Sequence, residues 1–386
     1  MIPLSIPNFE GNEQKYVLDA VSQGWVSTGG AYVEKLEEQI AEYSNTPLAV
    51  ACQSGTSALH MSLIELGVSR DDLVVVPTLT FIAAVNPVMY VGAEPIFMDC
   101  DDSLCMDADK LLLFCEKECN YTDGRLVYKK NNKQVKAIIV VHVFGNMANM
   151  EKLLEVSKKY DIKIIEDATE ALGTYYIDGP LKDKYAGTIG ELGAYSFNGN
   201  KIITTGGGGA VTSNNKQRAE HIKYLSTQAK NDAHFYVHNE IGFNYRMTNV
   251  QAALGVAQME CLETFIERKN KNYDLYCELL NGEKSYCMLP FSNGIRSNKW
   301  FYSLVVNIDI TNKDIRDIIK ELEDEGVQSR PIWGLIHEQL PYRRFEAYKI
   351  EKAKYYSERI INLPSSTNIT REEIITVCDK IKKILP

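Results

Sequence analysis

One lysine, Lys201, lies in a stretch of small and uncharged residues that could give it a chemical role. Its nearest charged neighbours along the chain are Glu191 and Lys216, so it has no local salt-bridge partner. A lysine that forms imines must spend time neutral, and apolar surroundings lower its pKa from about 10.4 towards roughly 7–8. Glycines at 206–209 let the backbone approach a ligand closely. Taken alone, this stretch also fits an ordinary surface loop.

Two further motifs could act with this lysine. The turn at 54–57 (Ser-Gly-Thr-Ser) lies between an apolar run and a helical pattern, so it could hold an anion at a helix N-terminus. Asp167 ends another apolar run, where a carboxylate could keep a ring nitrogen protonated. Such a charge pair is worth up to ~4 kcal/mol at ~4 Å and a dielectric constant of ~20, or roughly three pKa units. A helix N-cap is the alternative for both motifs. With the lysine, they suit a pyridoxal phosphate enzyme.

Alternating strand and helix patterns predict how these residues are positioned. Nearly continuous apolar runs predict buried strands at 48–51, 72–76, 94–98, 137–141 and 162–167. Amphipathic patterns predict helices at 12–23, 32–43, 58–66, 81–91 and 150–159. This alternation indicates an α/β fold whose mostly parallel sheet is sandwiched by helices. Right-handed crossovers then bring the strand ends, including Asp167, to one edge, where open sheets bind ligands.

The last third of the chain predicts a smaller α+β domain. Residues 248–272 form a long helical pattern that can bridge two domains. Beyond it we expect one strand and three helices, at 302–307, 314–325, 346–361 and 371–385. We therefore expect a large domain at 1–260 and a small domain at 261–386. The polar segment 116–136 predicts a surface hairpin.

Composition limits the classes of partner. The net charge of −9 argues against nucleic acid. No apolar run approaches the ~20 residues that span a membrane, and the N-terminus does not read as a signal peptide. The nine cysteines are scattered without metal-ligand spacing, which favours reduced thiols in a cytoplasmic protein and no metal site.

The chain resembles the sugar aminotransferases of the DegT–DnrJ–StrS type, within the fold-type I pyridoxal phosphate enzymes, over essentially its whole length. The resemblance rests on motifs at 24–29 (GWVSTG), 54–59 (SGTSAL), 77–83 (PTLTFIA), 141–145 (VHVFG), 166–168 (EDA), 196–201 (SFNGNK) and 242–246 (GFNYR). It implies pyridoxal 5'-phosphate as cofactor and a homodimer with shared active sites. Related dehydratases carry histidine at the lysine position, so Lys201 favours transamination.

The resemblance implies roles at the matching positions. Lys201 would carry the internal aldimine and move protons, Asp167 would pair with the pyridine nitrogen, and Phe81 would stack on the ring. The remaining cofactor contacts would be Gly55, Thr56, Ser57, Glu170, Ser196 and, from the neighbouring subunit, Asn244. Similarity of motifs assigns the sugar site to Trp25, Ser27, His142, Arg330, Trp333 and His337. A packed structural pair is the alternative for Trp333 and His337.

Two departures from the family pattern stand out. Glu170 replaces the usual glutamine near the phenolic oxygen of the cofactor, so one of these two groups would have to be protonated. The glycine run at 206–209 lacks the usual glutamate.

Among subtypes, the motifs around Asp167 and Lys201 are most similar to aminotransferases of legionaminic acid biosynthesis, with those of bacillosamine biosynthesis close by. We therefore expect transfer of an amino group from L-glutamate to C4 of a UDP- or GDP-linked 4-keto-6-deoxy-2-acetamido sugar. A 3-keto sugar, a scyllo-inosose-type cyclitol and a non-catalytic regulatory role remain alternatives.

Overall fold

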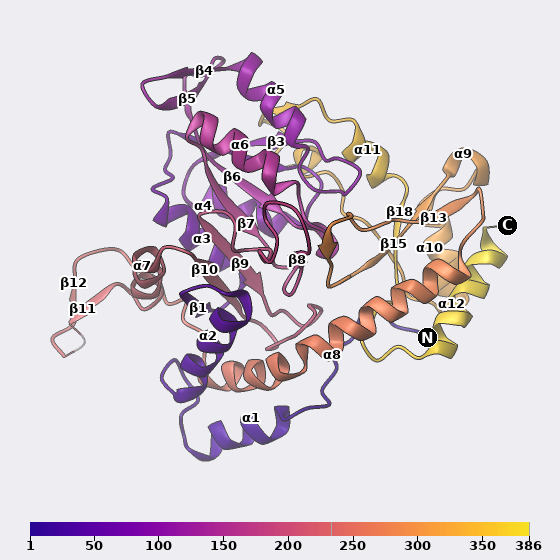
Figure 1. The fold of residues 1–386 in the computed structure, drawn as a ribbon, viewed down its shortest axis with the longest axis horizontal. Helices are drawn as coiled ribbons and strands as arrows, with labels where there is room; N and C mark the ends of the chain where they lie inside the picture. Colours follow the sequence, from indigo (N-terminus) through magenta and orange to yellow (C-terminus); the bar gives the residue numbers. More distant parts are fainter. Residues whose placement is uncertain (233, 386) are drawn as a thin grey trace.

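A mostly parallel sheet forms the centre of the larger part of the molecule (Figure 1). The computed structural model describes residues 1–232 and 234–385. β10 runs antiparallel to both of its neighbours, and the other pairs along the sheet are parallel. In spatial order the strands are β1 (Leu48–Cys52), β10 (Gly209–Ser213), β9 (Leu192–Ser196), β7 (Lys163–Asp167), β6 (Gln134–Val141), β2 (Asp72–Pro77), β3 (Glu94–Met98) and β17 (Ala347–Tyr348).

Burial on both faces explains the continuous apolar strands. Helices α5 and α6 lie in front of the sheet in Figure 1, and α3 and α4 lie behind it. All residues of β2 are therefore buried. The helices of this part are α1 (Glu13–Ser22), α2 (Ala31–Ser44), α3 (Gly55–Glu65), α4 (Asn86–Tyr90), α5 (Ala108–Glu118), α6 (Met150–Tyr160) and α7 (Lys216–Ser226), with 3₁₀ turns η1 (Ile82–Ala84) and η2 (Val143–Gly145).

The strand register brings the chemical residues to one edge. Val141 at the end of β6 lies opposite Asp167 at the end of β7, and Asp167 lies opposite Ala194 of β9. Lys201 follows β9 within a few residues. The fold prediction is therefore confirmed, and the strand ends meet at one edge as expected.

Helix α8 (Asn249–Leu279) runs from the larger part into the smaller part (Figure 1). Thr248 and Gln251 form a capping box at its first turn, which satisfies N–H groups that lack intrahelical partners. The smaller part has an antiparallel sheet and its own apolar core. Its elements are β13 (Tyr286–Met288), β15 (Tyr302–Val306), β18 (Ile360–Leu363), β16 (Arg330–Pro331), α9 (Ile308–Thr311), α10 (Ile315–Asp324), η3 (Ile336–Glu338), α11 (Lys352–Ser357) and α12 (Arg371–Ile384).

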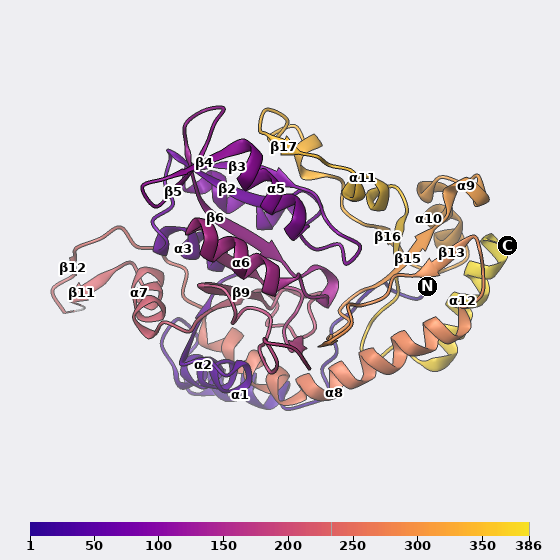
Figure 2. The same cartoon turned by 45° about the horizontal axis from the view of Figure 1, so that its top comes forward.

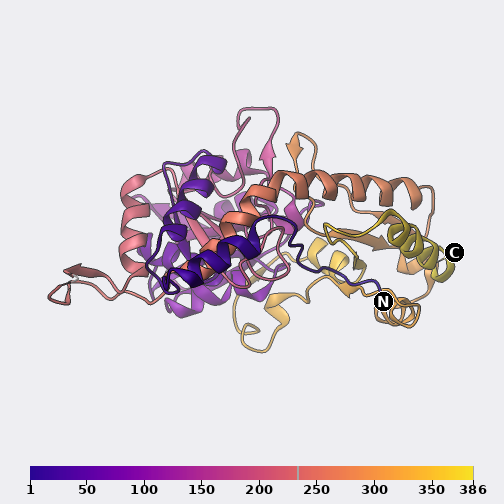
Figure 3. The same cartoon turned by 90° about the horizontal axis from the view of Figure 1, so that it is seen from below.

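Two segments cross the expected boundary at residue 260, which itself stays a prediction. Ile2 pairs with Val327, so the N-terminus lies with the smaller part, where the C-terminus also lies (Figure 3). Strand β17 pairs with β3 and extends the central sheet (Figure 2). The N-terminal segment and β17 thus tie the two parts together.

Two predicted helices are wrong in extent. Residues 346–361 form β17, α11 and the start of β18, because the buried Asp99 carboxylate accepts hydrogen bonds from the N–H groups that begin α11. The pattern at 81–91 divides into η1 and α4, with Pro87 in the first turn of α4.

Several short paired elements complete the chain. The segment 116–136 contains the predicted hairpin, formed by β4 (Cys119–Thr122) and β5 (Arg125–Tyr128). Two more pairs join β8 (Tyr175–Tyr176) to β14 (Ile295–Arg296) and β11 (Lys230–Asp232) to β12 (Val237–His238). In the described ranges, no helix is both long enough and apolar enough to cross a membrane.

Candidate active site

A cavity of about 690 Å³ opens at the edge of the sheet where the parallel strands end. Its volume falls within the range of about 300–1,000 Å³ that is typical of small-molecule sites. The smaller part contributes the opposite wall through the segment 330–334. Of the predicted residues, the lining includes Gly55, Thr56, Phe81, Asp167, Glu170, Ser196, Lys201, Arg330 and Trp333.

The loop after β9 presents the Lys201 amine to this cavity. Phe197 holds the loop by backbone hydrogen bonds, donating to Gly208 and accepting from Thr205. Gly208 has a φ of +148°, which favours glycine at this close approach. The Nζ atom of Lys201 lies 3.6 Å from Glu170 Oε1 and 4.1 Å from the centroid of the Trp300 ring. The glycine run therefore shapes the loop that carries the lysine.

Asp167 is buried at the base of the cavity. Its Oδ1 atom accepts a hydrogen bond from Thr169 N–H at 3.1 Å, and its side chain lines the cavity. Burial raises the pKa of this carboxyl, and the cation of Lys201 partly opposes that shift. A cationic ring nitrogen placed against Asp167 would favour its charged form further.

Glu170 is buried beside Lys201. Its Oε2 atom accepts a hydrogen bond from Phe144 N–H at 2.8 Å, while Oε1 faces the lysine. Burial raises the pKa of the Glu170 carboxyl to about 7, against the opposing effect of the Lys201 cation. The carboxyl can therefore change protonation near neutral pH.

The turn between β1 and α3 fits an anion. Ser54 caps α3, because its Oγ atom accepts a hydrogen bond from Ser57 N–H at 3.0 Å. Gly55 packs so closely that an added Cβ would lie 2.8 Å from Thr169 and 3.1 Å from Ser196. Helix α3 thus directs its N-terminus, with its partial positive charge, into the cavity.

Ser57 contacts the turn that caps α3, and its expected contact with the cofactor stays a prediction. Its hydroxyl lies 2.6 Å from Ser54 Oγ, and it does not appear in the cavity lining. Ser57 thus supports the turn from within helix α3.

Aromatic side chains form the other walls. Phe81 follows β2 and keeps 55% of its surface exposed, which leaves a ring face available to a ligand. Opposite it, Phe144 packs against Trp333 with ring centroids 4.8 Å apart. Trp300 stacks on Phe301 at 4.0 Å and donates its indole N–H to Asn200, next to the lysine.

Trp300 and Phe144 are site residues that the sequence prediction missed. Phe144 belongs to a motif that carried the resemblance, so its position was a usable signal. Trp300 lies far along the chain from Lys201, and no local pattern indicates their contact.

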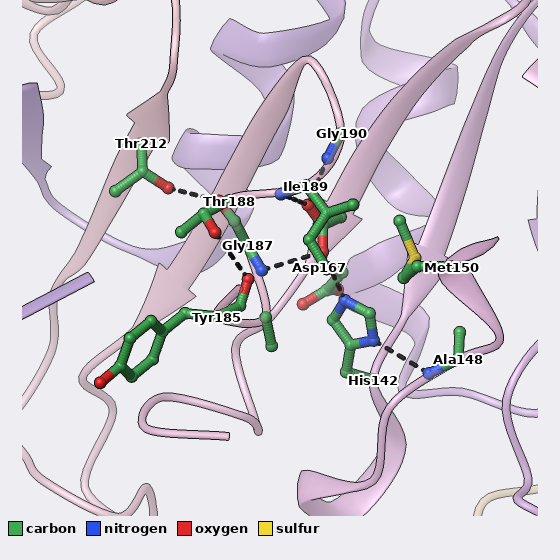
Figure 4. A network of polar contacts seen from close by, with 12 residues as sticks. His142, Ala148, Met150, Asp167, Tyr185, Gly187, Thr188, Ile189, Gly190 and Thr212 are labelled. Carbon is green, nitrogen blue, oxygen red and sulfur yellow. Dashed lines mark hydrogen bonds and ion pairs between the residues drawn. The ribbon is translucent and has the colours of Figure 1, made fainter. Parts of the chain in front are cut away.

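His142 is fully buried in a network beneath the strand ends (Figure 4). Its Nδ1 atom accepts from Ala148 N–H at 3.2 Å, so Nε2 carries the proton and donates to Glu166 at 2.8 Å. Glu166 also accepts hydrogen bonds from the N–H groups of Gly187 and Gly190. Both ring nitrogens of His142 thus form hydrogen bonds with protein groups, and His142 does not line the cavity.

His337 docks the smaller part onto the larger part. Its Nδ1 atom lies 2.6 Å from the hydroxyl of Thr78 at the end of β2. Because His337 is absent from the cavity lining, its contact is with protein, as in the packed alternative.

Trp25, Ser27 and Asn244 lie outside the cavity of their own chain. Trp25 is 60% exposed, and the carbonyls of Trp25 and Ser27 accept hydrogen bonds from Asn249. Asn244 is also exposed and accepts a hydrogen bond from Gln228. Their assigned roles stay predictions that a neighbouring subunit would have to fulfil.

The residues of the cavity fit pyridoxal phosphate. The crowded glycine turn at the start of α3 suits a phosphate, the buried Asp167 suits a ring nitrogen, and the exposed face of Phe81 suits an aromatic ring. Fold and site together define a pyridoxal phosphate-dependent enzyme of fold type I.

The model of the DegT/DnrJ/EryC1/StrS aminotransferase family matches residues 7–382. The chain therefore belongs to this family of pyridoxal phosphate-dependent nucleotide-sugar aminotransferases.

Three relatives illustrate the range of similarity. GDP-perosamine synthase of Escherichia coli O157:H7 is 34% identical, over 99% of this chain and 98% of its own. The UDP-4-amino-4,6-dideoxy-N-acetyl-beta-L-altrosamine transaminase of Campylobacter jejuni (strain 81-176) is 31% identical, over 93% of each chain. The PLP form of Spr1654 from Streptococcus pneumoniae superposes with a TM-score of 0.87 at 25% identity, covering 99% of this chain and 98% of its own.

Proposed function

We propose that this enzyme moves an amino group from L-glutamate to C4 of a nucleotide-linked 4-keto-6-deoxy-2-acetamido hexose. The product would enter the synthesis of legionaminic acid or a bacillosamine-type surface glycan. The name of the Campylobacter relative supports a 4-amino-4,6-dideoxy-N-acetyl sugar on UDP, and that of the Escherichia coli relative supports a GDP carrier. The observation that carries the proposal is a single cavity that contains Lys201, Asp167 and the sugar-site candidates Arg330 and Trp333.

The side chains of the cavity divide the work of transamination. Bound pyridoxal phosphate supplies an electron sink and carries the amino group between the two substrates. Gly55, Thr56 and Ser196 would hold its phosphate, and Asp167 would keep its ring nitrogen charged. Lys201 moves the proton between the carbon atoms that lose and gain it.

Arg330 is the best candidate to bind the diphosphate of the sugar nucleotide. Arg330 lines the cavity, and its side chain makes one hydrogen bond, to the adjacent carbonyl of Ser329 at 3.0 Å. Within residues 1–232 and 234–385, no carboxylate lies within ion-pair distance of it. Its donors thus remain available for charge-assisted bonds to phosphate. Trp333 offers an aromatic face to the sugar or base.

A homodimer would complete each site. The exposed side chain of Asn244 is available to a neighbouring cavity, so a twofold pair of subunits would exchange this residue. The nine free thiols further support a reducing compartment, and we place the enzyme in the cytoplasm.

Two half-reactions test the proposal. Loaded protein is treated with excess glutamate, cleared of small molecules, and mixed separately with the UDP- and GDP-linked 4-keto-6-deoxy-2-acetamido sugars. Loss of the visible cofactor band with glutamate and its return with one sugar, with formation of the 4-amino sugar, are expected. Loss of the band with glutamate but no return with either sugar would contradict the assignment of substrate.

A further inference from the structure

A closed ring of contacts surrounds the Lys201 amine. Its Nζ atom lies 3.6 Å from Glu170 Oε1 and 4.1 Å from the centroid of the Trp300 ring. Glu170 Oε2 accepts from Phe144 N–H at 2.8 Å, and the carbonyl of Phe144 accepts from Trp300 N–H at 3.0 Å. The N–H and the carbonyl of Phe144 thus hold the carboxyl of Glu170 and the backbone N–H of Trp300, the two residues whose side chains flank the lysine.

The backbone at Phe144 is strained to make these contacts. Phe144 has a φ of +56°, in the left-handed region, and the next residue, Gly145, has a φ of +91°. A left-handed conformation is strained in a bulky residue and persists only where the surroundings require it. Here the N–H of Phe144 donates to Glu170, and its carbonyl accepts from the backbone N–H of Trp300. The ring of Phe144 packs against Trp333. The strain therefore orients Glu170 towards the lysine.

The surroundings of Glu170 suit a group that takes up and releases a proton. Its side chain is 4% exposed, so water does not compete for it. Besides Lys201, the ionisable groups that face it are Asp167 on β7 and the thiol of Cys105. Burial raises the pKa of the Cys105 thiol to about 12, which leaves it neutral. Within the described residues, Asp167 and Lys201 are thus the main charges that act on the Glu170 carboxyl.

We propose that Glu170 is a proton-transfer partner of Lys201 whenever the lysine amine is free. The ammonium of Lys201 gives one proton to the Glu170 carboxylate, which leaves a neutral amine and a neutral carboxylic acid, and the reverse step returns the proton. The neutral amine is the form that can accept a proton from a substrate carbon. This role rests on the proposed aminotransfer, and the glutamine usual at this position in similar enzymes cannot accept the proton.

The test compares the holoenzyme with Glu170→Gln, which preserves shape and the acceptor for Phe144 N–H. Glu116→Gln, a surface carboxyl paired with Lys159, is the matched control. The rate at which saturating glutamate bleaches the visible cofactor band is measured from pH 6 to 8.5. In the wild type and E116Q, the bleaching rate should rise with pH as the Glu170 carboxyl ionises around pH 7. In E170Q, the rate should show no such rise and should be about 100-fold lower than in the wild type at pH 8. Glu170→Asp should recover part of the rate and the pH dependence.

A second readout does not depend on turnover. Infrared difference spectra between pH 6 and 8.5 should show a protonated carboxyl that disappears on titration, present in the wild type and E116Q and absent in E170Q. An unchanged pH profile in E170Q, or an unchanged infrared difference, would overturn the role of Glu170 while leaving the proposed function intact. If glutamate and the keto sugars fail to convert the wild type, the proposed function fails, and the infrared signal alone decides whether Glu170 exchanges a proton there.

Discussion

Lys269 allows a quantitative test of how the interior of this enzyme holds a charge. Its side chain is 2% exposed on α8, and its Nζ atom donates to the carbonyl of Trp300 at 2.7 Å and to that of Ser365. In the described part of the chain, no carboxylate lies within ion-pair distance of this amine. Burial lowers the pKa of Lys269 to about 7, from an ordinary value of about 10.4.

The shift fixes the sign and size of a pH effect on stability. Between pH 7 and 10.4 the unfolded chain holds a proton that the folded chain has lost, so stability rises with pH in this window. Each pH unit contributes about 1.4 kcal/mol, which gives about 3 kcal/mol between pH 7 and 9.5. Lys269→Met removes this titration and also the lysine donor of two buried carbonyls, of which that of Trp300 still accepts from Ser365 Oγ at 3.4 Å.

Urea unfolding followed by circular dichroism measures the effect at pH 6.5 and 9.5. The free energy of unfolding of the wild type minus that of K269M should increase by about 3 kcal/mol between these pH values. Lys271→Met, at an exposed position on the same helix, is the matched control and should give no such increase. A difference between wild type and K269M that stays constant with pH would refute the reasoning.

Three further predictions concern the cavity and its support. Gly55→Ala places a Cβ 2.8 Å from Thr169, so titration should show roughly tenfold weaker cofactor binding; unchanged affinity would argue against a phosphate in this turn. Asp167→Asn removes a charge pair worth up to ~4 kcal/mol, so the glutamate half-reaction should slow by up to about 1,000-fold. A rate within a few fold of the wild type would contradict its pairing with the ring nitrogen. Arg246→Leu leaves the buried Glu37 carboxylate with Lys223 as its remaining ion-pair partner, and urea unfolding should show a loss of about 2 kcal/mol; an unchanged midpoint would contradict this.

The sequence was sufficient to predict the helices and strands whose hydrophobic pattern is local. Apolar runs predicted the central parallel strands, and the strand ends placed Asp167 at the ligand edge because parallel strands share a direction. The sequence could not predict the elements that depend on contacts between segments far apart along the chain. β17 consists of two residues whose pairing with β3 has no periodic signal, and the Asp99 carboxylate that begins α11 lies far away in sequence.

The same limit applies to the site. Lys201 was recognisable from its uncharged surroundings and Glu170 from its departure from a motif. The contact of Trp300 with the lysine depends on how the smaller part packs, so the sequence could not predict it. His142 lies in a recognisable motif, yet its hydrogen bonds to Glu166 and Ala148 turn it away from the cavity.

The most direct test of the central claim is to locate the residue that bonds to the cofactor. The loaded protein is reduced with borohydride, digested and analysed by peptide mass spectrometry. The added mass of the reduced pyridoxyl phosphate group should lie on Lys201, and Lys201→Ala should retain the fold by circular dichroism but carry no label. A label on another lysine, or an equal yield of label in the alanine variant, would contradict the account.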